Sequence, residues 1–117
     1  GKLGETYNIG GNNEMTNIDV VRFICNLLDK KIENKPFNIS SFSNLIKFVD
    51  DRPGHDMRYS INASKIKNNL DWSPQETFET GIEKTVDWFL NNRKWWEDIL
   101  KSRYNLTRLG NSTKNEI

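Results

Sequence analysis

The chain has 117 residues and a mass of 13.7 kDa, and its 35% hydrophobic and 28% charged residues indicate one small, soluble, intracellular domain. Lys and Arg total 17 against 16 Asp and Glu, so the net charge of +1 argues against a nucleic-acid or acidic-membrane partner. One cysteine and one histidine exclude an internal disulfide and a usual zinc site, and the apolar runs fall far short of the roughly 20 residues that span a membrane.

The first part of the chain predicts a strand, a helix and a loop. Residues 5–9 favour a strand that stops at a Gly-Gly turn. Thr16 or Asn17 is the expected N-cap of the helix that follows. Its apolar residues recur at helical spacing and include Cys25, which we expect to be a buried core residue without a catalytic role. Residues 30–44, rich in Lys, Asn and Ser, predict a connecting loop.

The second part predicts further short strands and two helices. Residues 45–49 favour a strand before a Pro-Gly turn, and residues 57–61 are extended by pattern. Asn62 is the expected cap of a short helix that a Trp-Ser-Pro sequence ends. Thr77 is the expected cap of the longest helix, and tryptophans extend its apolar surface toward the C-terminus. The polar residues 110–117 are predicted to be disordered.

These elements predict an α/β fold of about three helices and two or three short strands, without a complete Rossmann domain. The only paired glycines, Gly10 and Gly11, are followed by Asn-Asn-Glu, so the G-x-G-x-x-G fingerprint is absent. The chain also lacks the G-x-x-x-x-G-K-[ST] pattern of a P-loop. Its first residues lead straight into a strand-like run, which suggests that the sequence starts partway through a longer protein.

The loop at residues 51–56, with the sequence Asp-Arg-Pro-Gly-His-Asp, is the densest polar cluster. It follows a predicted strand, and open α/β sheets bind ligands beyond the carboxyl ends of their strands. The guanidinium of Arg52 matches two phosphate oxygens, and His55 offers a second donor. The alternative is a surface turn in which Arg52 pairs with neighbouring acids. A metal-dependent phosphohydrolase would need more than one histidine.

The turn at residues 10–13 is a second candidate site. It precedes the predicted first helix, whose N-terminal N–H groups favour anions. Asn17 carries an amide that suits hydrogen bonds to a sugar or a base. The alternative is a plain strand-to-helix turn with a capping asparagine.

Several segments together resemble one enzyme family, the dTDP-glucose 4,6-dehydratases, which are extended short-chain dehydrogenases/reductases. The resemblance covers residues 1–109 in unbroken order and is most specific in the R-P-G-H-D loop and in the K-T-V-x-W sequence that begins at Lys84. Further matching segments begin at Gly4, Asn17, Arg58, Ala63, Trp72, Glu76 and Gly81, and Asn91 and Trp95-Trp96 also match. Two positions depart from the family pattern, with Asn62 in place of Asp and Asp71 in place of Gly, and both residues suit a cap or a left-handed backbone.

The resemblance implies a fold, an activity and a set of site residues. Residues 1–109 would be the C-terminal nucleotide-sugar-binding domain, which contains no catalytic residue. An N-terminal Rossmann half, with its Tyr-x-x-x-Lys pair and Thr-Asp-Glu set, would hold NAD. None of these motifs is in this chain. The family's contacts to the nucleotide diphosphate map onto these residues: Asn17, Asp51, Arg52, Pro53, Gly54 and His55, with Tyr104 as a further candidate.

The whole enzyme would convert dTDP-glucose to its 4-keto-6-deoxy sugar by internal NAD redox and loss of water, as a cytoplasmic homodimer in deoxysugar synthesis. Two alternatives remain open. The chain could belong to a sibling enzyme, such as a UDP-glucuronate decarboxylase, a GDP-mannose dehydratase or an epimerase. It could also be a non-catalytic module that binds nucleotide diphosphates or mediates assembly. Without the Rossmann half, we expect an inactive chain whose uncovered apolar residues, among them Tyr7, Ile9 and Phe48, promote self-association.

Overall fold

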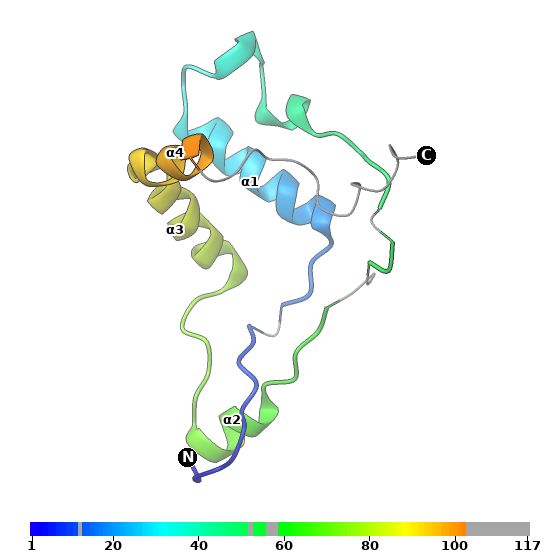
Figure 1. Cartoon of the computed structure of the whole chain (residues 1–117), viewed down its shortest axis with the longest axis vertical. Coiled ribbons are helices and arrows are strands. Elements are labelled where there is room, and N and C mark those ends of the chain that lie inside the picture. The colour runs from blue at the N-terminus through cyan, green and yellow to red at the C-terminus, as the bar shows by residue number, and fades with distance from the viewer. Residues whose placement is uncertain (12, 52, 56–58, 103–117) are drawn as a thin grey trace.

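Helices supply the regular structure of this protein, which the computed structural model describes over residues 1–11, 13–51, 53–55 and 59–102. In chain order they are α1 (Asn17–Lys31), the short 3-10 helices η1 (Pro36–Asn38) and η2 (Phe42–Leu45), then α2 (Ser64–Leu70), α3 (Phe78–Asn91) and α4 (Arg93–Ser102) (Figure 1). α1 packs against α3 and η2, and α3 contacts α4. α2 lies at the opposite end of the molecule, beside the N-terminal segment (Figure 1).

The predicted strands are not found in the residues that the structure describes. Residues 5–9 and 46–49 form neither helix nor strand, and Leu45 belongs to η2. Residues 59–61 are equally irregular, and residues 57 and 58 lie outside the described part. A strand exists through hydrogen bonds to neighbouring strands, and an isolated pair is marginal in water. The expected α/β class is therefore not confirmed over the described residues, which are helical.

α1 forms where its cap and apolar stripe predict it. Thr16 is the N-cap, and its Oγ1 accepts a hydrogen bond from the backbone N–H of Asp19 at 3.3 Å. Asn17 is therefore the first helical residue and not the cap. Cys25 and Leu27 are buried, which confirms Cys25 as a core residue.

The contact between α1 and α3 combines aromatic packing with an ion-pair cluster. The rings of Phe23 and Phe78 meet edge to face, with centroids 5.6 Å apart. Lys31 Nζ lies 3.1 Å from Glu83 Oε1 and 2.8 Å from Asp87 Oδ1. The hydrogen bonds that Lys31 donates to these two carboxylates, Asp87 first, hold the pKa of Lys31 above its ordinary value. The cluster ties the C-terminal turn of α1 to the middle of α3.

Asp29 attaches η2 to α1. Its carboxylate accepts hydrogen bonds from Ser41 Oγ at 2.6 Å and from the backbone N–H of Phe42 at 3.0 Å. These bonds, that from Ser41 first, lower the pKa of Asp29. The N-terminus of η2 is also closed by a capping box between Ser41 and Asn44. Phe42 is buried as a result, and the residues predicted as a loop contribute to the core.

α2 anchors the N-terminal segment through one lysine. Lys65 Nζ donates to Glu5 Oε2 at 2.6 Å and to the carbonyl of Thr6 at 2.9 Å, and it lies 5.0 Å from the centroid of the Tyr7 ring. The hydrogen bond from Lys65 lowers the pKa of Glu5. Asp71 follows the helix with a φ of 52°, the left-handed conformation expected of it.

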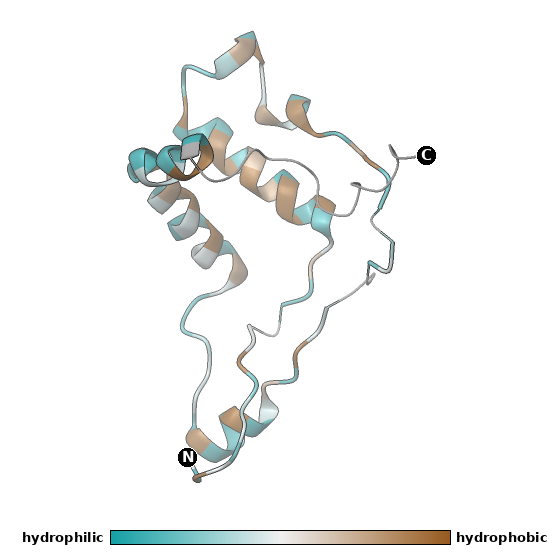
Figure 2. Cartoon of the chain, viewed as in Figure 1, coloured by the Kyte–Doolittle hydropathy of each residue, from teal (hydrophilic) through white to brown (hydrophobic). Residues whose placement is uncertain are grey.

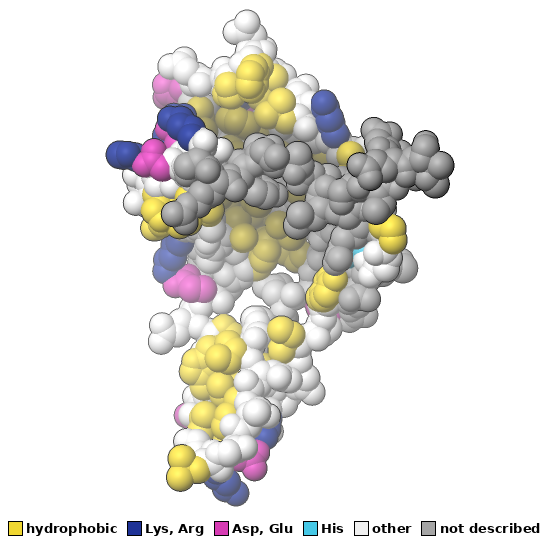
Figure 3. All heavy atoms as spheres, viewed as in Figure 1, with side chains coloured by type: hydrophobic (Ala, Val, Ile, Leu, Met, Phe, Trp, Pro, Cys, Tyr) yellow, Lys and Arg dark blue, Asp and Glu magenta, His cyan; other side chains and the backbone are white. Residues whose placement is uncertain are grey.

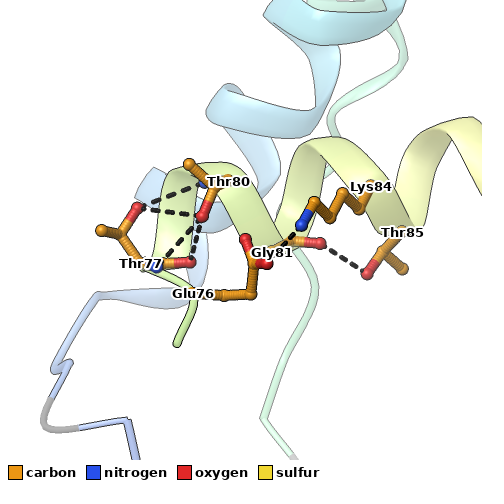
Figure 4. A network of polar contacts seen from close by, with 6 residues as sticks. All are labelled: Glu76, Thr77, Thr80, Gly81, Lys84 and Thr85. Carbon is orange, nitrogen blue, oxygen red and sulfur yellow. Dashed lines mark hydrogen bonds and ion pairs between the residues drawn. The ribbon is translucent and has the colours of Figure 1, made fainter. Parts of the chain in front are cut away.

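α3 starts at the predicted cap. The Oγ1 of Thr77 accepts from the backbone N–H of Thr80 at 3.2 Å, and the Oγ1 of Thr80 accepts from the backbone N–H of Thr77 at 3.0 Å (Figure 4). An ion pair between Lys84 and Glu76 adds to the same turn (Figure 4). The helix ends at Asn91, so the tryptophan-rich stretch forms a separate α4.

The tryptophans connect α3 and α4. The rings of Trp88 and Trp95 meet edge to face with centroids 5.1 Å apart, and Trp96 Nε1 donates to the carbonyl of Phe89 at 2.9 Å. Trp88 and Trp95 nevertheless stay exposed. These contacts join α3 to α4 while much of Trp88 and Trp95 stays in solvent.

The isolated chain exposes an unusually large surface. Its radius of gyration is 18.8 Å, against about 13 Å for a compact domain of this length. Its accessible surface is 10690 Å², against roughly 6,600 Å² for a folded monomer of this mass. Apolar residues lie along α1 and α3 and in the end of the molecule that contains α2 (Figure 2). Apolar side chains also gather on the face of that end that Figure 3 shows.

Extended segments carry some of the most exposed apolar side chains. Phe48 is 84% exposed, Val49 70% and Ile9 66%, whereas Tyr7 is partly covered. This exposure agrees with the expectation of uncovered apolar area, and self-association itself stays a prediction. Among the described helices, none combines the length and apolar character that crossing a membrane requires.

Candidate functional site

A side-chain contact joins two described residues of the loop predicted to hold an anion. His55 Nδ1 lies 2.5 Å from Oδ1 of Asp51. Gly54 between them has a φ of +70°, a left-handed backbone that glycine adopts without strain. The His55 side chain is 24% exposed and that of Asp51 72%. The predicted turn is therefore present, and its histidine is partly covered.

The far end of this loop meets the segment that follows the Gly-Gly turn. The ring of Tyr59 lies 6.4 Å from that of His55, centroid to centroid, with a tilt of 41°. The neighbouring Ser60 donates from Oγ to Oε1 of Glu14 at 2.7 Å. The structure thus places the segment of the predicted Gly-Gly turn beside residues 59–61, which follow the loop at residues 51–56 and belong to neither predicted site. It also adds Glu14, Tyr59 and Ser60, which no local pattern singled out.

A cavity of about 410 Å³ lies between these two segments. Its lining residues are Gly10, Gly11, Asn13, Glu14, Tyr59, Ser60 and Ile61. The lining offers a carboxylate, a hydroxyl, an amide and an aromatic ring, which are groups that bind polar organic ligands rather than a bare apolar one. The site that the geometry supports is therefore a binding site.

The other predicted site residues either do not line the cavity or lie outside the described part of the chain. Asn17 is exposed at the start of α1, and the described residues that line the cavity do not include it. Pro53 and Gly54 form the exposed turn of the loop. Arg52 and Tyr104 lie outside the described residues. The described structure therefore joins His55 to Asp51 and Tyr59, and it leaves the other predicted contacts as predictions.

The described residues do not fit a metal ion or a dinucleotide. No group of three His, Cys, Asp or Glu side chains that could hold a metal occurs among them. A dinucleotide site needs a glycine-rich turn that opens directly into a helix after a strand. Here Gly10 and Gly11 follow an irregular segment, and α1 starts only at Asn17. Gly10 has another role, because it allows the two segments to approach closely.

The Gly10→Ala variant is expected to push the two segments apart. A Cβ at Gly10 would lie 3.0 Å from Cβ and Cγ2 of Ile61, closer than ordinary packing allows. A Cβ at Gly11 would meet nothing within 4 Å, so Gly11→Ala is the matched control. We expect Gly10→Ala to shift the amide resonances of residues 59–61 and Gly11→Ala to leave them in place. Equal shifts in the two variants would contradict the close approach.

Comparison with known proteins identifies related sequences. The family model for GDP-mannose 4,6 dehydratase matches residues 1–85. A dTDP-glucose 4,6-dehydratase of Escherichia coli is 59% identical over 94% of this chain, which spans 30% of that relative. One from Neisseria meningitidis is 53% identical over 94% of this chain and 31% of its own length. The chain thus spans less than a third of these curated relatives.

A solved structure agrees with this result. The crystal structure of a dTDP-glucose 4,6-dehydratase from Bacillus anthracis, in complex with NAD, is similar with a TM-score of 0.63 and 46% sequence identity. The match covers 80% of this chain and 26% of the other. At that identity the similarity concerns sequence as well as fold.

Proposed function

We propose that this chain, which belongs to the GDP-mannose 4,6 dehydratase family, is the nucleotide-sugar-binding part of a dTDP-glucose 4,6-dehydratase. The observation that carries the proposal is the 59% identity to a relative of that name over 94% of the chain. An alignment of that coverage includes the whole Asp-Arg-Pro-Gly-His loop. The exact substrate, dTDP-glucose, is part of the proposal, since the matching family model carries the name of a GDP-sugar enzyme.

In this proposal the loop at residues 51–55 holds the diphosphate of the nucleotide sugar. Arg52 would donate hydrogen bonds to two phosphate oxygens at once, and the Pro53-Gly54 turn would limit the conformational freedom of the loop. His55 would supply one more hydrogen bond from a side chain that is 24% exposed. Asn17 and Tyr104 would contact the nucleotide from outside the loop.

The chemistry of dehydration is assigned to the rest of the enzyme. The solved relative is a complex with NAD, but the residues of this chain do not fit a dinucleotide, as the Gly10-Gly11 turn indicates. We therefore place the NAD site and the catalytic residues in a separate Rossmann half. This chain would contribute binding energy from the nucleotide, which orients the sugar for reaction elsewhere. Homodimer formation and a cytoplasmic location stay predictions.

The expected result for the chain by itself is selective binding without turnover. Calorimetric titration should give tighter binding of dTDP than of UDP or GDP, because the R-P-G-H-D loop resembles the thymidine enzymes. Incubation with dTDP-glucose and NAD should yield no 4-keto-6-deoxy sugar, detected by its absorbance in alkali. Preference for GDP would favour the GDP-mannose sibling. Binding of none of the three by a chain with intact helical circular dichroism would contradict the proposal, as would clear turnover.

A further inference from the structure

The contact between Asp51 and His55 determines which ring nitrogen carries a proton. The Asp51 Oδ1 to His55 Nδ1 distance is 2.5 Å, which is shorter than an ordinary N–H···O hydrogen bond and places the two atoms in direct contact. An ionised carboxylate has acceptor atoms only, so the hydrogen of this bond must belong to Nδ1 of the imidazole. In the neutral ring, a proton on Nδ1 leaves Nε2 with a lone pair. Asp51 therefore selects the tautomer as well as the orientation of the ring.

The ring is also fixed by its surroundings. Its side chain is 24% exposed, against 72% for Asp51, so the imidazole is the more covered member of the pair. The aromatic ring of Tyr59 lies at 6.4 Å, centroid to centroid, with a tilt of 41°. The acid and the aromatic ring together restrict the rotation of the imidazole. The ring atom left for a ligand is Nε2.

We propose that Asp51 is a positioning residue, which holds Nδ1 of His55 so that Nε2–H of the protonated ring donates to a phosphate oxygen of the bound nucleotide. The inference rests on the proposed function and changes the role of Asp51, which the family resemblance implied to be a direct ligand contact. An exposed carboxylate beside a diphosphate would repel it, whereas a carboxylate bound to Nδ1 of the imidazole leaves Nε2 to face the ligand. Asp51 acts through His55 and not on the nucleotide.

The phosphate acceptor also determines how the bound imidazole is protonated, which a spectrum can measure. A phosphate oxygen only accepts hydrogen bonds, so Nε2 must carry a proton in the complex. Because Nδ1 is already bonded to Asp51, the bound state has both ring nitrogens protonated. The free chain in its neutral form should have a proton on Nδ1 alone. Nucleotide binding should therefore add a proton to Nε2.

The tautomer can be read without ambiguity because His55 is the only histidine of the chain. Two-bond ¹H–¹⁵N correlation spectra of the labelled chain should show a protonated Nδ1 and an unprotonated Nε2 at alkaline pH. In Asp51→Asn the amide can donate or accept, so it no longer selects a tautomer and the two ¹⁵N shifts should converge. Asp50→Asn is the matched control, because it removes the same charge from the adjacent residue. It should leave the spectrum of the parent chain unchanged.

The binding arm of the experiment uses dTDP as the probe. Saturation with dTDP should move both ring nitrogens of the parent chain to shifts of a protonated ring. Asp51→Asn should bind dTDP roughly tenfold more weakly, the effect expected of a weakened hydrogen bond to a charged group, and Asp50→Asn should bind as the parent does. Asp51→Glu, which keeps the carboxylate, should recover part of the affinity.

The outcomes separate the inference from the proposed function. The same tautomer in the parent and in Asp51→Asn would overturn the positioning role, even if dTDP binds. Equal loss of affinity in Asp51→Asn and Asp50→Asn would also overturn it, since the effect would then be one of net charge. If the tautomer depends on Asp51 but dTDP changes the ¹⁵N shifts of no variant, the proposed nucleotide site is wrong. The Asp51–His55 pair would then have no role in nucleotide binding.

Discussion

Replacement of Arg52 by alanine is expected to weaken the binding of dTDP by ten- to a hundredfold. Arg52 follows an acidic pair and precedes the Pro-Gly turn, whose exposed position makes the loop accessible to a ligand. A guanidinium can hold two phosphate oxygens, and hydrogen bonds to charged groups contribute about 1.5–3 kcal/mol each. This range corresponds to the expected loss of affinity. Calorimetric titration of dTDP into the parent and variant chains measures the effect.

Two further variants make the Arg52 experiment specific. Arg52→Lys should recover only part of the affinity, because an ammonium group cannot reproduce the bidentate geometry. Arg22→Ala is the matched control, since it removes the same charge from an exposed position on α1, where Arg22 lies 4.0 Å from Asp19. If Arg52→Ala binds dTDP within about twofold of the parent, the loop is a surface turn and the proposed diphosphate site is wrong.

Replacement of Phe42 by alanine is expected to lower the free energy of unfolding by about 3 kcal/mol, the lower end of the range for a buried phenylalanine. Phe42 is one of the few buried apolar side chains of the described chain, and it belongs to η2, which packs on α1. Its backbone N–H is held by Asp29, so the segment cannot readily collapse into the space that the ring leaves. Urea unfolding followed by circular dichroism measures the change.

The control for Phe42→Ala is Phe37→Ala in the neighbouring 3-10 helix. Phe37 is 83% exposed, so removal of its ring changes little apolar burial and should alter the stability by less than about 0.5 kcal/mol. Both substitutions delete the same atoms within the same connecting segment. Equal destabilisation of the two variants would mean that η2 does not pack on α1 as described.

Local signals in the sequence were sufficient for the starts of α1 and α3, although the cap of α2 is Ala63 and not the expected Asn62. The Thr16 cap and the apolar stripe that includes Cys25 predicted α1, and the Thr77 cap predicted the start of α3. The left-handed backbone of Asp71 was also foreseen. Capping bonds join residues two or three positions apart, and helical periodicity is set within one segment. Such features need no knowledge of the rest of the chain.

The strands and the break between α3 and α4 were not predictable in the same way. A β-favouring run such as residues 5–9 becomes a strand only beside a partner strand, and the described residues supply none. The apolar spacing from α3 continues into α4, so periodicity alone did not indicate the end of the helix at Asn91. The two 3-10 helices arose in residues whose composition predicted a loop.

The composition of the candidate site was determined by the sequence, and its assembly by the tertiary structure. Residue types alone made the Arg-Pro-Gly-His loop a candidate for binding phosphate oxygens, with a plain surface turn as the alternative, because a guanidinium and an imidazole both donate to anionic oxygens. The bond from Ser60 to Glu14 joins residues 46 positions apart, and no local pattern encodes such a contact. The choice of Asp51 as the partner of His55, among three nearby aspartates, likewise depends on the path of the backbone through the positive φ of Gly54.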